Sequence, residues 1–502
     1  MALRAGRRRD ADDRSATMTE QQHGEQYDVV VVGGGAIGEN VADRAGRTGL
    51  GVALVEHGLV GGECSYWACM PSKALLRPGG ALAAARAVPG AAGAVTGSVD
   101  AAAAFAWRDE TTHGWDDGSQ VQWLDSAGIT LLRGHARFVG PRTLELSGGE
   151  APRRIEARRA VVVATGSWPV IPDIPGLADV EPWTSRDATS AHAVPPRLLV
   201  LGGGVVGVEM ATAYTELGSQ VTLVVRGPRP LAGAEPFAGD RVVTALRERG
   251  TRVLIDSEVT AVEKTATGIA VTVSGDGAGT VEVDRVLVAA GRRPGTTELG
   301  VETLGLEPGR PIDVDDALCA TGVDGGWLFA AGDVTGRTGT THQGKYDARV
   351  AGDVVAARFG DEDDGRAAES GAGPWSRFRA SADHRSVPQV VFSHPEVAWV
   401  GLTEADARRA GLDVRVLDYD LADIAGASVF AKDYAGQGRL VVDRARGVVV
   451  GATFVGPEVA EMLHAATIAV VGEVPLDRLW HAVPAYPTVS EVWLRFLESA
   501  GL

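Results

Sequence analysis

The 502-residue chain is poor in cysteine, in aromatic residues and in positive charge. Its 3 cysteines are too few for a disulfide scaffold in a chain of this length, so they serve local chemistry or packing. With 48 Lys and Arg against 65 Asp and Glu, the net charge of −17 argues against a general binder of nucleic acids or of anionic membranes. The chain has no run of about 18 apolar residues, so no membrane-spanning helix is predicted.

The N-terminal segment lacks the features of a secretory signal. Residues 1–26 contain three consecutive arginines, Arg7–Arg9, but no apolar run behind them. We expect a disordered tail over 1–26, a start at either Met1 or Met18, and a cytoplasmic protein.

Glycine is the residue in excess. The chain contains 66 glycines, whereas an average composition of about 7% would give roughly half that number. The rest of the composition, 45% hydrophobic and 23% charged, is that of a globular protein, and the length suggests about three domains. The glycine excess therefore points to tight turns where the backbone approaches something closely.

The first such turn follows a β-branched segment, residues 27–32, which predicts a central strand of a parallel sheet. Gly33, Gly35 and Gly38 come next in a G-x-G-x-x-G pattern, then a stretch compatible with a helix and a second strand. The first glycine allows a tight turn, the second lets the backbone approach a pyrophosphate, and the third lets helix and strand pack. Glu56 ends the second strand and would accept hydrogen bonds from a ribose diol. The unit predicts a dinucleotide site.

The same pattern recurs later in the chain. A strand at 197–201 leads into Gly202, Gly204 and Gly207, a helix, and a further strand at 221–225. Two such units in one chain suggest two different dinucleotides, with electrons passing between them.

The second unit differs from the first at the acidic position. Val225 stands where a ribose-binding carboxylate would be expected, and Arg226 and Arg229 follow it. Guanidinium groups can pair with a 2′-phosphate, so the pattern favours NADP(H) over NAD(H), although NAD(H) is possible. The alternative is that both arginines are solvated loop residues.

Further strands end in glycine-containing turns that suit the crevice outside the carboxyl edge of a sheet. The strands are 160–163, 286–288 and 327–330. The candidate cofactor-binding residues in the turns after them are Thr165, Gly166, Gly291, Gly332 and Asp333.

Cys64 and Cys69 lie in a glycine-flanked segment, 61–73, directly after the first unit. In a regular helix their Cα atoms would be about 8 Å apart, so a bond between them would need a distorted turn. A zinc site needs more ligands than two thiols, and two buried packing cysteines would not explain the flanking glycines. The third interpretation, a redox-active dithiol beside a flavin, suits Cys69 at a helix N-terminus, where the dipole stabilises a thiolate.

Taken together, these motifs resemble the class I pyridine nucleotide-disulfide oxidoreductases, a family that includes dihydrolipoamide dehydrogenase, glutathione reductase and mercuric reductase. The match extends from about residue 27 over nearly the whole chain, and includes the segments 392–396 and 400–404. The resemblance implies an α/β fold with two Rossmann-like dinucleotide-binding domains, for FAD and NAD(P), and a C-terminal α+β dimerisation domain. The expected boundaries are 27–194 and 316–385 for FAD, 195–315 for NAD(P), and 386–502 for dimerisation.

The resemblance also implies roles for individual residues. Cys69 would be the charge-transfer cysteine that faces the flavin, and Cys64 the interchange cysteine that meets the substrate. Lys73 would pair with Glu209 near the flavin, and Asp333 would bind the ribityl and phosphate region of FAD. Cys319 matches nothing in the pattern and is expected to be a packing residue. No metal site is expected.

The chain departs from the family at the residue expected to act as acid and base. Where thiol reductases carry a histidine followed by a glutamate that orients it, this chain has Tyr486 and Glu491. A phenol with an ordinary pKa of about 10 can donate a proton but is a poor base at neutral pH. His481, five residues upstream, could substitute.

The sequence therefore predicts a homodimeric FAD enzyme that passes hydride from NADPH through the Cys64–Cys69 pair to a small-molecule disulfide or other soft acceptor. The alternatives are a flavin diaphorase that reduces quinones with an incidental dithiol, and a dihydrolipoamide dehydrogenase-like subunit of a larger complex. Mercury reduction has little support, because no cysteine follows Cys319 to form a C-terminal pair.

Overall fold

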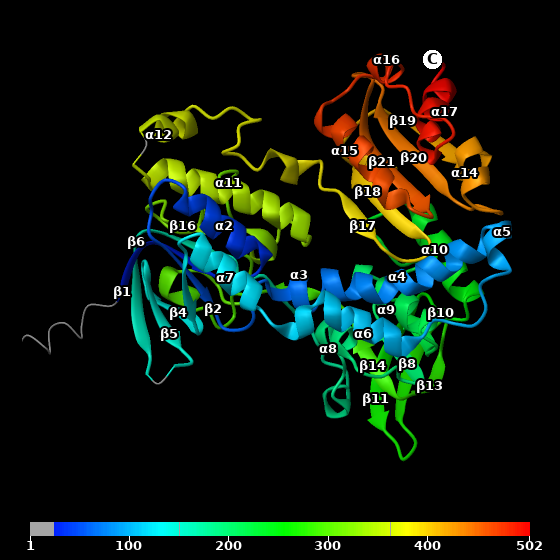
Figure 1. Ribbon diagram of the computed structural model, residues 1–502, viewed down its shortest axis with the longest axis horizontal. Coiled ribbons are helices and arrows are strands. Elements are labelled where there is room, and N and C mark those ends of the chain that lie inside the picture. The colour runs from blue at the N-terminus through cyan, green and yellow to red at the C-terminus, as the bar shows by residue number, and fades with distance from the viewer. Residues whose placement is uncertain (1–24, 150, 362) are drawn as a thin grey trace, which may run out of the picture. The chain divides into compact units, whose positions relative to one another are not determined.

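The computed structural model describes residues 25–149, 151–361 and 363–502 (Figure 1). They form two compact units. Unit 1 comprises Met1–Gly62, Asp117–Ser167 and Pro294–Ala380, and unit 2 comprises Glu63–Asp116, Trp168–Arg293 and Ser381–Leu502. The first strand begins at Glu25, two residues before the end of the expected tail, and residues 1–24 of that tail lie outside the described residues. No helix among the described residues is both long and apolar enough to cross a membrane.

Unit 1 is built on one mixed sheet. Its strands are β1 (Glu25–Val32), β2 (Val52–Glu56), β3 (Thr130–Arg133), β4 (His135–Gly140), β5 (Thr143–Ser147), β6 (Arg153–Val163) and β16 (Leu328–Ala330). They are ordered β3-β2-β1-β6-β5-β4, and β16 pairs with β6. β1 is parallel to β2 and β6, whereas β4 and β5 are antiparallel additions. Register places Val32 beside both Val55 and Val163, so three strand ends meet at one edge.

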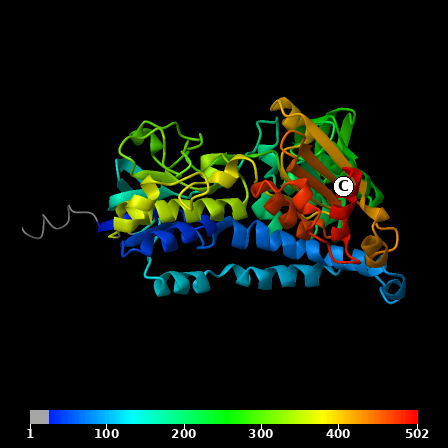
Figure 2. The same cartoon turned by 90° about the horizontal axis from the view of Figure 1, so that it is seen from above.

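Both faces of β1 are buried, which explains its continuous run of β-branched residues. Val29 and Val31 pack into one core cluster together with the helices, and Val30 and Val32 pack into a second cluster on the opposite face. α2 (Ala36–Gly46) and α11 (Thr341–Phe359) lie side by side over the sheet (Figure 2). The unit also contains α7 (Gly118–Ser126), α12 (Asp363–Ser370), η3 (Val301–Leu304) and η4 (Gly332–Thr335). α12 lies in a segment for which the sequence predicts no helix.

Unit 2 contains the second Rossmann-like sheet. Its parallel strands are ordered β10 (Arg252–Leu254), β9 (Gln220–Val224), β8 (Arg197–Leu201) and β14 (Arg285–Val288), with helices α9 (Val205–Glu216) and α10 (Pro236–Glu248). A separate antiparallel sheet is formed by β11 (Ser257–Lys264), β12 (Ile269–Gly275) and β13 (Gly279–Val283).

The C-terminal part of unit 2 has an antiparallel sheet. Its order is β17 (Gln389–Val391), β18 (Glu396–Gly401), β21 (Val448–Gly456), β20 (Gln437–Asp443) and β19 (Val414–Asp420). The helices of this part are α13 (Glu404–Arg409), α14 (Ala425–Phe430), α15 (Leu463–Val471), α16 (Leu476–Leu479) and α17 (Val492–Ser499). The expected fold class, two Rossmann-like cores and a C-terminal α+β part, is confirmed. The residue boundaries of the five expected segments stay predictions.

Unit 2 also contains the helices that carry the cysteine pair and several shorter elements. They are α3 (Gly62–Tyr66), α4 (Cys69–Arg86), α5 (Pro89–Ala92), α6 (Ala101–Thr111), η1 (His113–Trp115) and α8 (Ser185–Ser190), with the short strand β15 (Arg292–Pro294).

Candidate dinucleotide and dithiol sites

The first glycine turn in unit 1 is closed by backbone contacts. Gly33 has φ +104°, and a Cβ there would lie 2.4 Å from the carbonyl oxygen of Ala164. A Cβ on Gly38 would lie 1.8 Å from the carbonyl oxygen of Gly33. Both positions therefore admit only glycine, for reasons internal to the fold.

Gly35 differs from these two glycines because space is open beside it. It precedes α2 with φ −73°, and the nearest atom to a Cβ there is the Cα of Gly62 at 3.9 Å. No side chain caps this helix end, so its backbone N–H groups and its positive dipole end suit an anionic ligand. The fold does not require a glycine here, but a pyrophosphate approaching the backbone would.

Glu56 is positioned by the backbone at the end of β2. It is only 8% exposed; its Oε2 accepts a hydrogen bond from Gly34 N at 2.7 Å, and its Oε1 accepts one from Gly58 N at 2.6 Å. These two bonds fix the carboxylate beside the glycine turn, where a ribose diol would donate to it.

The turns after β6 and β16 bring a second set of polar groups to unit 1. Ser167 Oγ donates to Asp333 Oδ2 at 2.6 Å. Gly166 and Gly332 both have positive φ, at +65° and +78°. The Oγ1 atom of Thr165 is buried without a hydrogen-bond partner. These residues fit a bound dinucleotide, which would supply the acceptor that this hydroxyl lacks.

Sequence reasoning missed Glu39, which directly follows the third glycine. Burial raises its pKa from 4.5 to about 7; the charge of Glu56 also raises it, and that of Lys345 lowers it. The signal in the sequence was a carboxylate at the fourth position of α2, after three residues without polar side chains.

Glu39→Gln is expected to stabilise the protein more at pH 8 than at pH 5. A carboxyl whose pKa is raised on folding stays protonated in the folded state up to about pH 7, so folding loses stability as the pH rises from about 4.5 to 7. The amide removes this loss, which amounts to at most about 3 kcal/mol. Thermal unfolding of the variant and the wild type at both pH values measures the difference in stability. An equal difference at pH 5 and pH 8 would contradict the argument that burial raises the pKa of Glu39.

The second glycine turn, in unit 2, repeats the geometry of the first. Gly202 has φ +122°, and a Cβ there would lie 2.2 Å from the Ala289 carbonyl oxygen; on Gly207 it would lie 1.9 Å from the Gly202 carbonyl oxygen. Gly204 precedes α9 and has nothing within 4 Å of a Cβ, and Gly291, with φ +131°, is equally open. The second turn therefore also offers room at an uncapped helix N-terminus.

The strand end of the second unit carries no carboxylate at the position that Glu56 occupies in the first. Val225 is 4% exposed and packs against Gly203, as Glu56 does against Gly34. The Arg226 side chain is 86% exposed and only 4.0 Å from Glu258, whereas Arg229 pairs with Asp240 at 3.1 Å. A hydrophobic residue replaces the carboxylate, and an extended arginine follows it.

The two close cysteines lie on different helices of unit 2. Cys64 is within α3, and Cys69 is the first residue of α4. The helix is broken between them at Ala68, whose φ is −128° and ψ is −93°, and Ala68 N donates to the Glu63 carbonyl oxygen at 2.6 Å. Both cysteines are partly exposed. The break is the distortion that a bond between residues five apart would need.

A buried network holds the segment between the cysteines. Trp115 Nε1 donates to the Tyr66 carbonyl oxygen at 3.1 Å, and Thr189 Oγ1 donates to the Trp67 carbonyl oxygen at 2.8 Å. Arg108 is fully buried, bonds the carbonyl oxygen of Thr189, and lies 5.1 Å from the Trp115 ring. These contacts satisfy backbone groups that the helix break leaves without helical partners.

Lys73 and Glu209 form an ion pair in unit 2. Their Nζ and Oε2 atoms are 2.8 Å apart, and Glu209 is 3% exposed. The other oxygen of Glu209 accepts a hydrogen bond from Phe392 N at 3.0 Å, and Lys73 Nζ lies 4.9 Å from the Phe392 ring. The pairing expected from the sequence is present, and its role beside a flavin stays a prediction.

Tyr486 and Glu491 lie in very different environments. Tyr486 is 75% exposed, whereas Glu491 is 5% exposed and pairs with Arg495 through Oε1. Its Oε2 is buried without a hydrogen-bond partner. His481 is exposed. The Tyr486 phenol is therefore exposed to solvent, whereas the Glu491 carboxylate is buried.

Comparison with known proteins matches both parts of the chain to one family. Residues 27–348 match the model of the pyridine nucleotide-disulphide oxidoreductases, and residues 387–495 match the dimerisation domain of the same family. The chain belongs to this family. Its members depend on FAD and a pyridine nucleotide.

Similar proteins differ in the acceptor that their names indicate. The chain is 30% identical to a mercuric reductase of Staphylococcus aureus over 470 residues, covering 93% of this chain and 81% of that protein. It is 32% identical to a dihydrolipoyl dehydrogenase of Thermus scotoductus over 471 residues, covering 93% of this chain and 95% of that protein. The structure is also similar to that of the Cu(II) complex of the HOCl-induced flavoprotein disulfide reductase RclA of Escherichia coli, with a TM-score of 0.80 and 25% sequence identity. The superposition covers 95% of this chain and 99% of that chain.

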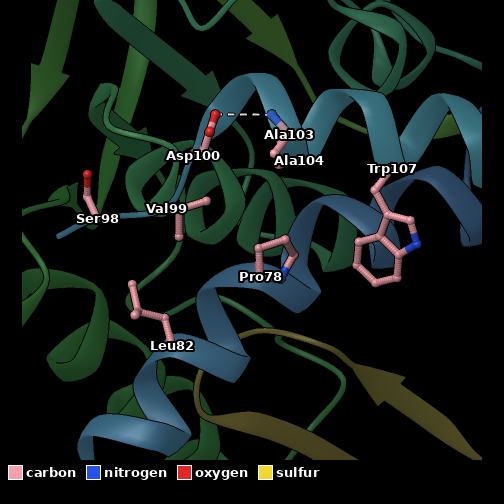
Figure 3. A pocket seen from close by; sticks show the side chains of 8 residues that line it. All are labelled: Pro78, Leu82, Ser98, Val99, Asp100, Ala103, Ala104 and Trp107. Carbon is pink, nitrogen blue, oxygen red and sulfur yellow. Dashed lines mark hydrogen bonds between the residues drawn. The ribbon is translucent and has the colours of Figure 1, made fainter. Parts of the chain in front are cut away.

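Two further features of this disulphide oxidoreductase lie apart from the motifs. Cys319 is 9% exposed in unit 1, and burial raises the pKa of its thiol, in keeping with a packing residue. A hollow of about 370 Å³ lies between α4 and α6 of unit 2, lined by Pro78, Leu82, Ser98, Val99, Asp100, Ala103, Ala104 and Trp107 (Figure 3). Asp100 faces the first turn of α6 and accepts a hydrogen bond from Ala103 N, so the polar group in the hollow caps a helix.

Proposed function

We propose that this oxidoreductase passes electrons from NADPH, through FAD, to a Cys64–Cys69 disulfide and on to a disulfide or other soft acceptor. The observation that carries the proposal is the helix break at Ala68, which puts the two cysteines at separate, partly exposed positions of α3 and α4. A packing pair would not need this distortion, and the hydrogen bonds from Trp115 and Thr189 to the Tyr66 and Trp67 carbonyl oxygens support it.

FAD would be held by Gly33, Gly35, Gly38 and Glu56, together with the residues after β6 and β16: Thr165, Gly166, Gly332 and Asp333. When bound, it accepts hydride from the nicotinamide and gives up two electrons. Gly202, Gly204, Gly207 and Gly291 would hold the pyridine nucleotide. The open space beside Gly35 and Gly204 and the unpaired hydroxyl of Thr165 support this assignment.

The two thiols would act in sequence on a disulfide. The Cys64 thiolate attacks one acceptor sulfur, forming a mixed disulfide and releasing one thiolate. The Cys69 thiolate then attacks the Cys64 sulfur, restoring the Cys64–Cys69 disulfide and releasing the second thiolate. Cys69 is suited to remain ionised because it begins α4, where the helix dipole favours a thiolate.

Tyr486 favours reduction of an acceptor disulfide over oxidation of a dithiol. Released thiolates need only a proton donor, which a phenol can be, whereas oxidation of a dithiol needs a base to form the attacking thiolate. Exposure of Tyr486 on the C-terminal part suits a group that acts in a homodimer. Val483, 84% exposed, and Ile468, 56% exposed, supply apolar surface for that association.

Arg226→Ala and Arg229→Ala are expected to raise the KM for NADPH by about tenfold or more, with little change for NADH, since each would remove a charge-assisted bond to the 2′-phosphate. Arg252→Ala is the control, because Arg252 is an exposed arginine at the start of β10. Steady-state kinetics with both nucleotides measure the effect. Comparable kcat/KM for NADPH and NADH in the wild type would show the NADPH assignment to be wrong.

The function is tested by turnover with disulfides, quinones and metal ions, in the wild type and in Cys64→Ser. Loss of disulfide turnover alone supports the dithiol route. Quinone turnover that is unchanged, with no disulfide turnover even in the wild type, would instead favour a diaphorase. Stable co-purifying partners and no turnover on any acceptor would favour a subunit of a larger assembly.

A further inference from the structure

We propose that Arg186 and Arg292 are positioning residues that keep the Cys64 thiol reactive by neutralising Glu63. The inference rests on the proposed role of Cys64 as the thiol that meets the acceptor. Glu63, Arg186 and Arg292 all belong to unit 2, on α3, α8 and β15.

Glu63 is an obstacle to thiolate formation at Cys64. The two residues are neighbours in the first turn of α3, and the Glu63 side chain is only 26% exposed. A carboxylate this close raises the pKa of a thiol, because two negative charges repel each other. An acid at this position therefore needs compensation if Cys64 is to attack a disulfide at neutral pH.

Arg186 provides the first compensating charge. Its guanidinium pairs with Glu63 and stacks on two indoles, 4.3 Å from the Trp67 ring and 5.1 Å from the Trp168 ring. Trp67 directly follows α3, and its N–H donates to the Glu63 carbonyl oxygen at 2.8 Å, so the two residues are one helical turn apart. A planar guanidinium stacks flat on an indole and presents its N–H donors in a fixed fork, whereas a lysine ammonium is a compact point charge.

Arg292 provides the second compensating charge. Its Nη2 atom is 3.8 Å from Glu63 Oε2, the oxygen that makes no hydrogen bond. Two guanidinium groups thus surround one carboxylate beside Cys64, and the cluster carries a net positive charge. Three other charged groups on the packed elements have partners of their own: Lys73 with Glu209, Asp187 with Thr184, and Arg108 with Asp109. Arg293 on β15 and Arg77 on α4 are exposed.

The test is the alkylation rate of Cys64 in the reduced holoenzyme. The protein is reduced with dithiothreitol, treated with iodoacetamide across a pH series, and the Cys64 peptide is quantified by mass spectrometry. Arg186→Gln is expected to slow alkylation at pH 7 by about three- to tenfold and to move the pH profile upward. Arg186→Lys should recover part of the rate, and Glu63→Gln/Arg186→Gln should recover nearly all of it.

Arg408→Gln, which breaks an exposed pair with Glu404 on α13, is the matched control and should leave the rate unchanged. Thermal unfolding and flavin content verify that each variant is folded. An unchanged rate in Arg186→Gln, or a double variant as slow as the single one, would overturn the inference. A wild-type Cys64 that resists alkylation even after reduction would instead overturn its proposed role as the interchange thiol.

Discussion

Cys64→Ser is expected to lower disulfide reduction by at least about a thousandfold, because the variant lacks the nucleophile that forms the mixed disulfide. Transfer from NADPH to a quinone should stay within about twofold of the wild type, since that route needs no thiol. Steady-state rates with a disulfide and a quinone acceptor, measured on the same preparation, separate the two activities.

Cys319→Ala is the control for this variant. Cys319 is buried in unit 1, whereas Cys64 and Cys69 belong to unit 2, so its replacement should change neither rate. Disulfide reduction that persists in Cys64→Ser would reject the dithiol route. An equal loss of both activities would show that the serine variant has lost more than a nucleophile.

Gly38→Ala is expected to lower the stability of the fold, whereas Gly35→Ala is expected to lower the affinity for FAD. A Cβ added at position 38 would be 1.8 Å from a backbone oxygen, so the fold must shift, at a cost of about 2 kcal/mol or more. Position 35 has open space and φ −73°, which alanine adopts readily, so stability should change little. FAD affinity in Gly35→Ala should nevertheless fall by at least about tenfold, because the methyl group keeps the pyrophosphate from the backbone.

Chemical unfolding of the apoprotein gives the stability change, and titration with FAD followed by flavin fluorescence gives the affinity. Gly204→Ala extends the comparison to unit 2, where FAD binding should be normal and the KM for NADPH raised. Unaltered FAD affinity in Gly35→Ala would place the cofactor elsewhere than at the N-terminus of α2.

The sequence predicted the strand–turn–helix–strand units well because the residues that determine each unit lie within about 25 positions of one another. The turn at Gly33–Gly38 and the acid at Glu56 are such features, since strand, turn, helix and strand specify one another. The pairing of Lys73 with Glu209 came from family resemblance instead, because 136 residues separate the two.

The surroundings of the cysteines were not predictable in the same way. The sequence indicated that a distorted turn was needed, but not that Arg108 would be buried beside it to bond the Thr189 carbonyl oxygen. Arg186 reaches Glu63 from 123 positions away, and nothing in its local sequence marks it as a partner of an indole. Such contacts depend on how α8 packs, which local patterns do not contain. α12 was missed because its polar, glycine-containing sequence is typical of a loop.

The two glycine turns have nearly the same backbone, so they account for dinucleotide binding in both units but not for the choice of coenzyme in either. Gly34 contacts Glu56 in the way that Gly203 contacts Val225, and both helices begin at an uncapped glycine with open space beside it. The turns alone therefore cannot distinguish one coenzyme from another. Redesign of coenzyme preference in this protein can be confined to residues 225–229, leaving the backbone of the nucleotide turn as it is.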